Sequence, residues 1–170
     1  IMFSSNRGNA DPEDFDVYAM NADGSGVRRI TSGPDVDTYA SWSPDGTKIV
    51  LRRVVGGIDG NNEVFIMNAD GTGAVNLTDS PLYDGWPVWS PDGTRIAYAS
   101  GTGSGHPHRI VVMNPDGSGK VFVTDAPEGG FVHDRHPWFH PDGERIVLTP
   151  YGQGVRENWE LCVVRAPRAG

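Results

Sequence analysis

Short apolar runs alternate with turn-forming residues along the whole chain. The runs Glu63–Met67, Arg95–Ala99 and Arg109–Met113 are rich in β-branched and aromatic residues, and each is bounded by Gly, Pro, Asn or Asp. Short runs of this composition between turn residues predict β-strands. The pattern therefore predicts an all-β protein.

One kind of turn occurs three times with nearly the same sequence. Pro44–Gly46, Pro91–Gly93 and Pro141–Gly143 all read Pro-Asp-Gly and follow Trp-Ser, Trp-Ser and Phe-His. Proline presets φ for the first central turn position, Asp tolerates the second, and Gly adopts the left-handed conformation that follows. Each copy therefore predicts a tight hairpin between two antiparallel strands, and its aspartate (Asp45, Asp92 or Asp142) needs no ligand to explain it.

A second turn, Asn-x-Asp-Gly, alternates with the first and shares its period. Asn21, Asn68 and Asn114 are 47 and 46 residues apart, and the prolines of the first turn are 47 and 50 apart. Such a period with four strands per unit is typical of a β-propeller blade. One propeller domain is predicted over residues 1–170, with repeats at approximately 1–46, 47–93, 94–143 and 144–170. Labelled a to d from the axis outwards, the strands read bcd, abcd, abcd and abc, which makes about four blades with the first and last incomplete.

The residues of these motifs carry a resemblance to a known family. Trp89–Ala97 together with Ile66–Gly73, the latter followed by Leu77-Thr78, resembles the WD-repeat-like blade of TolB-type β-propellers. The resemblance covers essentially the whole chain. It implies a periplasmic or otherwise exported binding platform, because TolB is a periplasmic partner of a lipoprotein. Other relatives are propeller domains of peptidases or lyases.

An incomplete propeller leaves sheet edges and apolar faces open at both ends. Such surfaces invite pairing with another chain. We therefore expect either self-association that closes the ring or a longer propeller of which these residues are a part.

Alternating strand direction divides the turns and loops between two rims of the disc. The a–b and c–d turns, which are the repeated Pro-Asp-Gly and Asn-x-Asp-Gly sequences, form one rim, here called the turn rim. The b–c and d–a loops vary in length and composition and form the other, the loop rim. Because function concentrates on variable loops held by a rigid scaffold, the loop rim is the predicted binding surface.

The start of each inner strand supplies the candidate binding residues. Alignment on the hairpins places three acids and three ring side chains at equivalent positions near the mouth of the central channel: Asp37, Asp84 and Asp134, and Tyr39, Trp86 and His136. The carboxylates could attract a cation or a basic peptide segment, with the rings as contact surface. The alternative is that each aspartate caps its loop by accepting backbone N–H bonds.

Four histidines of the loop rim form a candidate metal site. His106 and His108 lie in one loop, and His133 and His136 lie in the next, beside Asp134. Imidazole and carboxylate ligands from adjacent loops could hold a divalent transition metal, although His-x-His also arises by chance. No other cofactor is indicated. Some lyases of the resembling class use a His-bound metal, but no motif here matches theirs.

Composition excludes several classes of partner. The formal net charge of -8 and the absence of a basic run disfavour nucleic acid. No apolar run approaches the length that crosses a bilayer, so membrane insertion is not expected. The single cysteine, Cys162, lies in an apolar stretch and is expected to be a small buried side chain.

Catalysis finds little support in the sequence. Gly103-Ser104-Gly105 lacks the flanking glycines of a nucleophile elbow, and no helix is predicted after it. The favoured function is therefore a noncatalytic TolB-like platform that binds a protein or peptide through the loop rim. The alternative is the propeller domain of a peptidase or lyase that gates or binds substrate.

Overall fold

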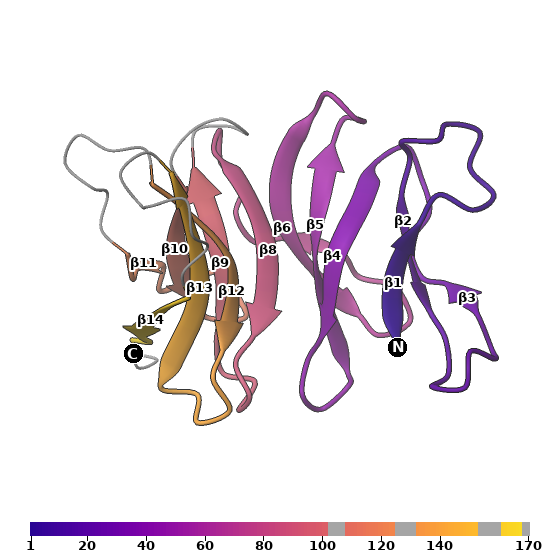
Figure 1. The fold of residues 1–170 in the computed structure, drawn as a ribbon. Coiled ribbons are helices and arrows are strands. Elements are labelled where there is room, and N and C mark those ends of the chain that lie inside the picture. Colours follow the sequence, from indigo (N-terminus) through magenta and orange to yellow (C-terminus); the bar gives the residue numbers. More distant parts are fainter. Residues whose placement is uncertain (102–107, 125–131, 153–160, 168–170) are drawn as a thin grey trace.

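The computed structural model describes residues 1–101, 108–124, 132–152 and 161–167, with backbone only at 132–134 and 150–152. The described residues form four antiparallel sheets and no helix. The sheets contain three, four, four and three strands, which confirms the predicted all-β propeller and its incomplete first and last blades (Figure 1).

The strands follow the chain from sheet to sheet. The first sheet contains β1 (Met2–Ser5), β2 (Asp16–Ala19) and β3 (Arg28–Arg29). The second contains β4 (Val36–Trp42), β5 (Lys48–Val55), β6 (Asn61–Asn68) and β7 (Val75–Asn76). The third contains β8 (Tyr83–Trp89), β9 (Ile96–Gly101), β10 (His108–Met113) and β11 (Val121–Phe122). The fourth contains β12 (Val132–Phe139), β13 (Arg145–Gly152) and β14 (Cys162–Arg165).

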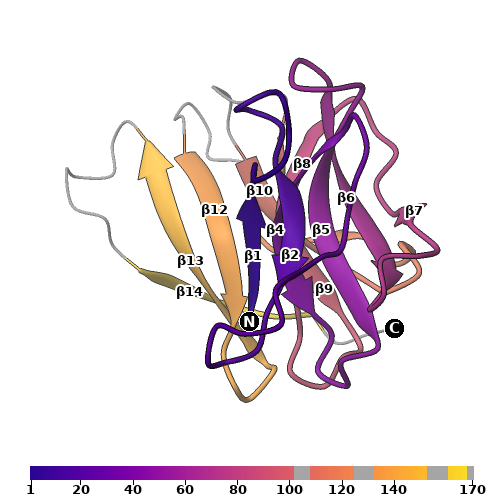
Figure 2. The same cartoon turned by 90° about the vertical axis from the view of Figure 1, so that its right-hand side faces the viewer.

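Both views place the turns and loops on the two predicted rims. The β4–β5 and β12–β13 hairpins lie at the bottom of the molecule, whereas the β1–β2 and β5–β6 loops lie at the top (Figures 1 and 2). The loop rim and turn rim thus occupy opposite ends of the strands.

The aspartate of each Pro-Asp-Gly turn holds the turn together. Asp92 accepts hydrogen bonds from the Thr94 backbone N–H (3.0 Å) and the Ser90 hydroxyl (2.5 Å), while Gly93 has φ of 71°. Asp45 has the same two contacts, with Thr47 and Ser43. The repeated acids are therefore parts of the scaffold.

These turn contacts predict a loss of stability in acid. The hydroxyl of Ser90 and the donors of Thr94 lower the pKa of Asp92 from 3.8 to about 2. A carboxylate with a lowered folded-state pKa stabilises the fold above its unfolded pKa, and that stability is lost as pH falls through the folded value. Asp92→Asn should therefore cost about 1 kcal/mol or less at pH 6, since the carboxylate is half exposed, and nothing near pH 2. Urea titrations of both proteins at several pH values check this, and a pH-independent difference would contradict it.

Consecutive sheets pack face to face and are arranged in an arc (Figure 1). Each of the three interfaces contains its own apolar cluster. Between the second and third sheets, for example, Val50 and Val64 of one pack with Ile96, Tyr98 and Met113 of the other. Strands β4, β8 and β12 are the inner strands of their sheets and contact one another along the axis.

The glycine of the Asn-x-Asp-Gly turn also contributes to sheet packing. Gly24 and Gly71 both have positive φ, 84° and 91°, but their surroundings differ. A Cβ on Gly71 would lie 2.2 Å from the carbonyl oxygen of Ile30 in the preceding sheet, whereas one on Gly24 would meet nothing within 4 Å. The turn of one blade therefore contacts the backbone of the blade before it.

This difference gives a matched pair of substitutions. Gly24→Ala should cost about 1 kcal/mol through backbone strain alone. Gly71→Ala should cost about 3 kcal/mol, because the sheets must also separate to relieve the clash. Chemical denaturation measures both. Equal losses would show that the turn does not determine how closely the sheets approach.

The fourth sheet leaves an apolar row open to solvent. Trp138, Val147 and Val163 are neighbours across β12, β13 and β14, and Trp138 and Val163 are 66% and 57% exposed. The corresponding row of the third sheet packs against the fourth: Val88, Ala97 and Val112. The open row is the kind of surface that the sequence predicts for an incomplete propeller, and self-association through it stays a prediction.

The prediction that Cys162 is buried is wrong. Its side chain is exposed, although it lies in the apolar stretch that forms β14. Strand β14 pairs only with β13, and no other described strand covers its outer side. Apolar sequence context is not sufficient for burial in a strand at the edge of a sheet.

Candidate functional site

The three inner strands share an unusual backbone feature at the predicted ring positions. Tyr39, Trp86 and His136 have φ of 52°, 53° and 50°, although none is glycine. In each strand the pairing register shifts at this point, as in a β-bulge. Positive φ is costly for bulky residues and is frequent at functional sites. The bulge directs the three rings of β4, β8 and β12 toward a common region.

Trp86 is the centre of the resulting ring cluster. Its indole ring lies 5.8 Å from Tyr39 and 5.2 Å from His136, between centroids, and so joins all three inner strands. Tyr83 and His108 also contact it, at 5.4 and 5.7 Å. Trp86 is buried, Tyr39 is 47% exposed and His136 is exposed, so the cluster has a buried centre and an accessible edge.

The rings line a small apolar cavity between the inner strands. It has a volume of about 250 Å³, and equivalent residues of the three strands surround it: Tyr39–Ser41, Trp86–Val88 and His136–Trp138. Partial desolvation and the neighbouring Arg135 guanidinium lower the pKa of His136, which favours the neutral imidazole. The lining suits an apolar or aromatic group of a ligand.

Two of the predicted carboxylates are buried and hydrogen-bonded within the scaffold. Asp37 is 1% exposed and accepts two hydrogen bonds of 2.7 Å from the Arg53 guanidinium. Asp84 is 2% exposed, and the Ser80 hydroxyl donates to it at 2.8 Å. Burial raises the pKa of both acids. Neither lines the cavities described here, and the donors given above are side chains rather than backbone N–H groups, so loop capping and the attraction of a cation or basic segment both stay predictions.

The structure places the candidate metal ligands only in part. His108 begins β10 and is completely buried, with its ring edge-on to both Tyr83 and Trp86. His136 also contacts the Trp86 ring, at 5.2 Å between centroids. His106 and the side chains of His133 and Asp134 lie outside the described residues. Within the described part of the chain, no three His, Cys, Asp or Glu side chains are grouped to hold a metal ion, and the metal site stays a prediction.

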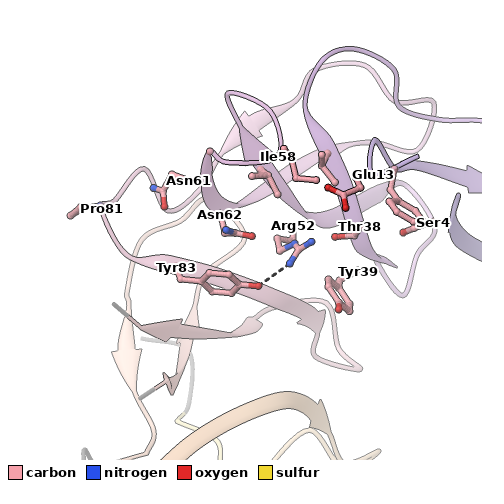
Figure 3. A pocket seen from close by; sticks show the side chains of 14 residues that line it. Ser4, Glu13, Thr38, Tyr39, Arg52, Ile58, Asn61, Asn62, Pro81 and Tyr83 are labelled. Atoms are coloured by element: carbon pink, nitrogen blue, oxygen red, sulfur yellow. Dashed lines mark hydrogen bonds between the residues drawn. The ribbon is translucent and has the colours of Figure 1, made fainter. Parts of the chain in front are cut away.

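A larger cavity adjoins the ring cluster at the loop rim. Its volume is about 1060 Å³, and it lies between the first and second sheets and the start of β8. Figure 3 shows Arg52 near its centre, bonded to the Tyr83 hydroxyl and beside Tyr39. Sequence reasoning missed Arg52, because an Arg-Arg pair inside a strand gives no sign of which side chain is enclosed.

Comparisons with known proteins agree with this architecture. No protein-family profile and no curated protein matches the chain. Among solved structures, a putative TolB from Agrobacterium tumefaciens matches 95% of the chain with a TM-score of 0.74 and 23% identity. TolB from Acinetobacter baumannii matches 88% with a TM-score of 0.68 and 19% identity. The chain has a TolB-type β-propeller fold.

The TolB-type fold is shared with an enzyme as well. An oligogalacturonate lyase in complex with manganese matches 89% of the chain, with a TM-score of 0.60 and 20% identity. The chain spans 55% and 35% of the two TolB chains and 41% of the lyase chain. The TolB-type fold therefore leaves the function to be argued from the site. Among the described residues, no helix has the length and hydrophobicity of a membrane span.

Proposed function

We propose that the chain is a noncatalytic binding module that recognises a protein or peptide segment at its loop rim. The convergence of Tyr39, Trp86 and His136 from three separate blades carries this proposal. A rigid aromatic centre with an exposed edge is the usual make-up of an interface hot spot. A TolB-like role also carries the expectation of an exported, periplasmic protein.

The arrangement of the site supports binding more than chemistry. The acids Asp37 and Asp84 are engaged within the scaffold and do not face a cavity described here. The accessible surface instead consists mainly of rings, Arg52 and the amides of Asn61 and Asn62, with Glu13 as its one described acid. Such a surface makes hydrogen bonds and apolar contacts with a bound chain.

Selection of peptides from a displayed random library on the immobilised chain tests the proposal. Tyr39→Ala removes an exposed ring of the loop rim and should weaken binding of a selected peptide about tenfold. Lys48→Ala, beside the Pro44–Gly46 turn on the opposite rim, should leave binding unchanged. Failure to select any peptide, or equal effects of the two substitutions, would contradict the proposal.

The alternative is a propeller domain that binds substrate for a hydrolase or lyase. The similarity of the fold to that of an oligogalacturonate lyase supports this alternative. Incubation of the chain with a selected peptide and with oligogalacturonate, followed by mass spectrometry, distinguishes the two. A binding module returns both compounds intact, whereas an enzyme returns products.

A further inference from the structure

We propose that Arg52 in the larger cavity is the recognition point for a carboxylate of an acidic peptide segment. This inference rests on the proposed function and specifies the chemistry of the partner. It differs from the sequence-based expectation of a basic segment, because the structure encloses the acids Asp37 and Asp84 and brings an arginine to the cavity instead.

The structure holds Arg52 in one orientation through three neighbours. Its guanidinium lies over the Tyr39 ring, 4.9 Å from the centroid, and one terminal nitrogen donates to the Tyr83 hydroxyl at 2.8 Å. Gly85 makes room for the stem, because a Cβ there would lie 3.2 Å from Cδ of Arg52. A guanidinium fixed between two tyrosines is preorganised, so little conformational entropy is lost when it binds an anion.

The charge of Arg52 has no partner within the described part of the chain. The next residue, Arg53, forms a two-bonded ion pair with Asp37, whereas no described carboxylate lies within 4.0 Å of the Arg52 guanidinium. Its Nε is buried and donates to no described acceptor, and the Thr38 hydroxyl across the β4–β5 pair is likewise buried without a partner. Buried polar groups are normally hydrogen-bonded, and arginine bonds carboxylates most strongly through two parallel contacts.

The size and lining of the cavity favour a peptide segment as the occupant. About 1060 Å³ is at the upper end for a small-molecule pocket. Amide, hydroxyl and backbone groups alternate with apolar side chains along the walls, which include Phe15, Val36, Val54, Ile58 and Pro81. That mixture provides hydrogen-bond partners for a peptide backbone and contact area for its side chains.

One acid, Glu13, also lines this cavity, and its negative charge opposes that of Arg52. It is exposed, whereas Arg52 is half-buried, so solvent screens the Glu13 charge more strongly. An acidic ligand is therefore attracted by Arg52 more strongly than it is repelled by Glu13.

Peptide display with the full chain, followed by calorimetry, tests the inference. Libraries of random peptides should yield sequences enriched in Asp or Glu. Replacing the selected acid by Asn or Gln should then weaken binding about tenfold, as expected for a charge-assisted hydrogen-bonded pair. Affinity should also fall as salt is raised from 50 to about 300 mM.

Four variants separate this role from a structural one. Arg52→Gln should lose about tenfold in affinity for the acidic peptide and gain none for its amide counterpart. Gly85→Ala retains the charge but displaces the stem, and should weaken binding with only a small loss of thermal stability. Glu13→Gln should strengthen binding about twofold. Lys48→Gln, on the turn rim, is the control for a general change of charge.

Each outcome bears on a different claim. Selected peptides without acidic enrichment, or equal affinity of wild type and Arg52→Gln, would overturn the Arg52 assignment while the binding function stands. Selection of no peptide would overturn both. Binding of an oligosaccharide of uronic acids through Arg52, with no acidic peptide selected, would overturn the peptide as occupant.

Discussion

Trp86→Ala should lower the free energy of unfolding by about 3–5 kcal/mol, the usual cost of removing a buried tryptophan. Its indole ring contacts four other rings and joins the inner strands β4, β8 and β12. Truncation would leave a cavity where three blades meet, and the remaining rings would lose their common support. Urea denaturation followed by far-UV circular dichroism measures the loss.

Trp138→Ala is the matched control for this substitution. Trp138 lies two residues beyond His136 on β12 and is 66% exposed, so its removal from the monomeric chain should cost less than about 1 kcal/mol. Trp86→Phe, which keeps an aromatic ring, should retain about half of the stability lost in Trp86→Ala. Similar losses for the two alanine variants would contradict a central role for Trp86.

Arg53→Met should destabilise the chain by about 3–5 kcal/mol, because it leaves the Asp37 carboxylate buried without its ion-pair partner. Asp37 is 1% exposed and bonds both oxygens to Arg53. Arg52→Met, one residue earlier, removes a cation with no carboxylate partner and should cost much less. The double variant Asp37→Leu/Arg53→Met should recover most of the loss, since no charge then remains buried.

The loss in Arg53→Met should also depend on pH. Burial raises the pKa of Asp37, and Arg53 opposes that rise, so removing Arg53 raises the pKa further. An acid whose folded-state pKa is raised destabilises the fold as pH rises through that window. The deficit of Arg53→Met should therefore be smaller at pH 4 than at pH 7. A deficit that grows toward acid would contradict this account.

The sequence was sufficient to predict the blades and their rims. Pro-Asp-Gly and Asn-x-Asp-Gly place φ-specific residues at fixed positions, and those local requirements determine where strands end. The same alignment placed Tyr39, Trp86 and His136 at equivalent positions of the inner strands, where the structure has them.

Features that depend on contacts with neighbouring blades could not be predicted from the sequence. The positive φ of Tyr39 and Trp86 arises from a bulge in each strand. Because neither residue is a glycine, the sequence gives no signal for such a bulge. Asp37 was predicted at the channel mouth, but the packing of the first sheet encloses it. Cys162 was predicted to be buried, but it is exposed in a strand that pairs, among the described strands, only with β13. Burial in a repeat protein depends on what the adjacent repeat covers.

Hydroxyl-radical footprinting of the chain with and without a selected peptide tests the central claim most directly, because it maps the bound surface side chain by side chain. If the loop rim is the binding surface, the peptide will protect Tyr39 and Tyr83, and oxidation of residues beside the Pro-Asp-Gly turns, such as Ile66 and Val75, will not change. Protection confined to Ile66, Val75 and their neighbours would place the partner on the turn rim and contradict the account.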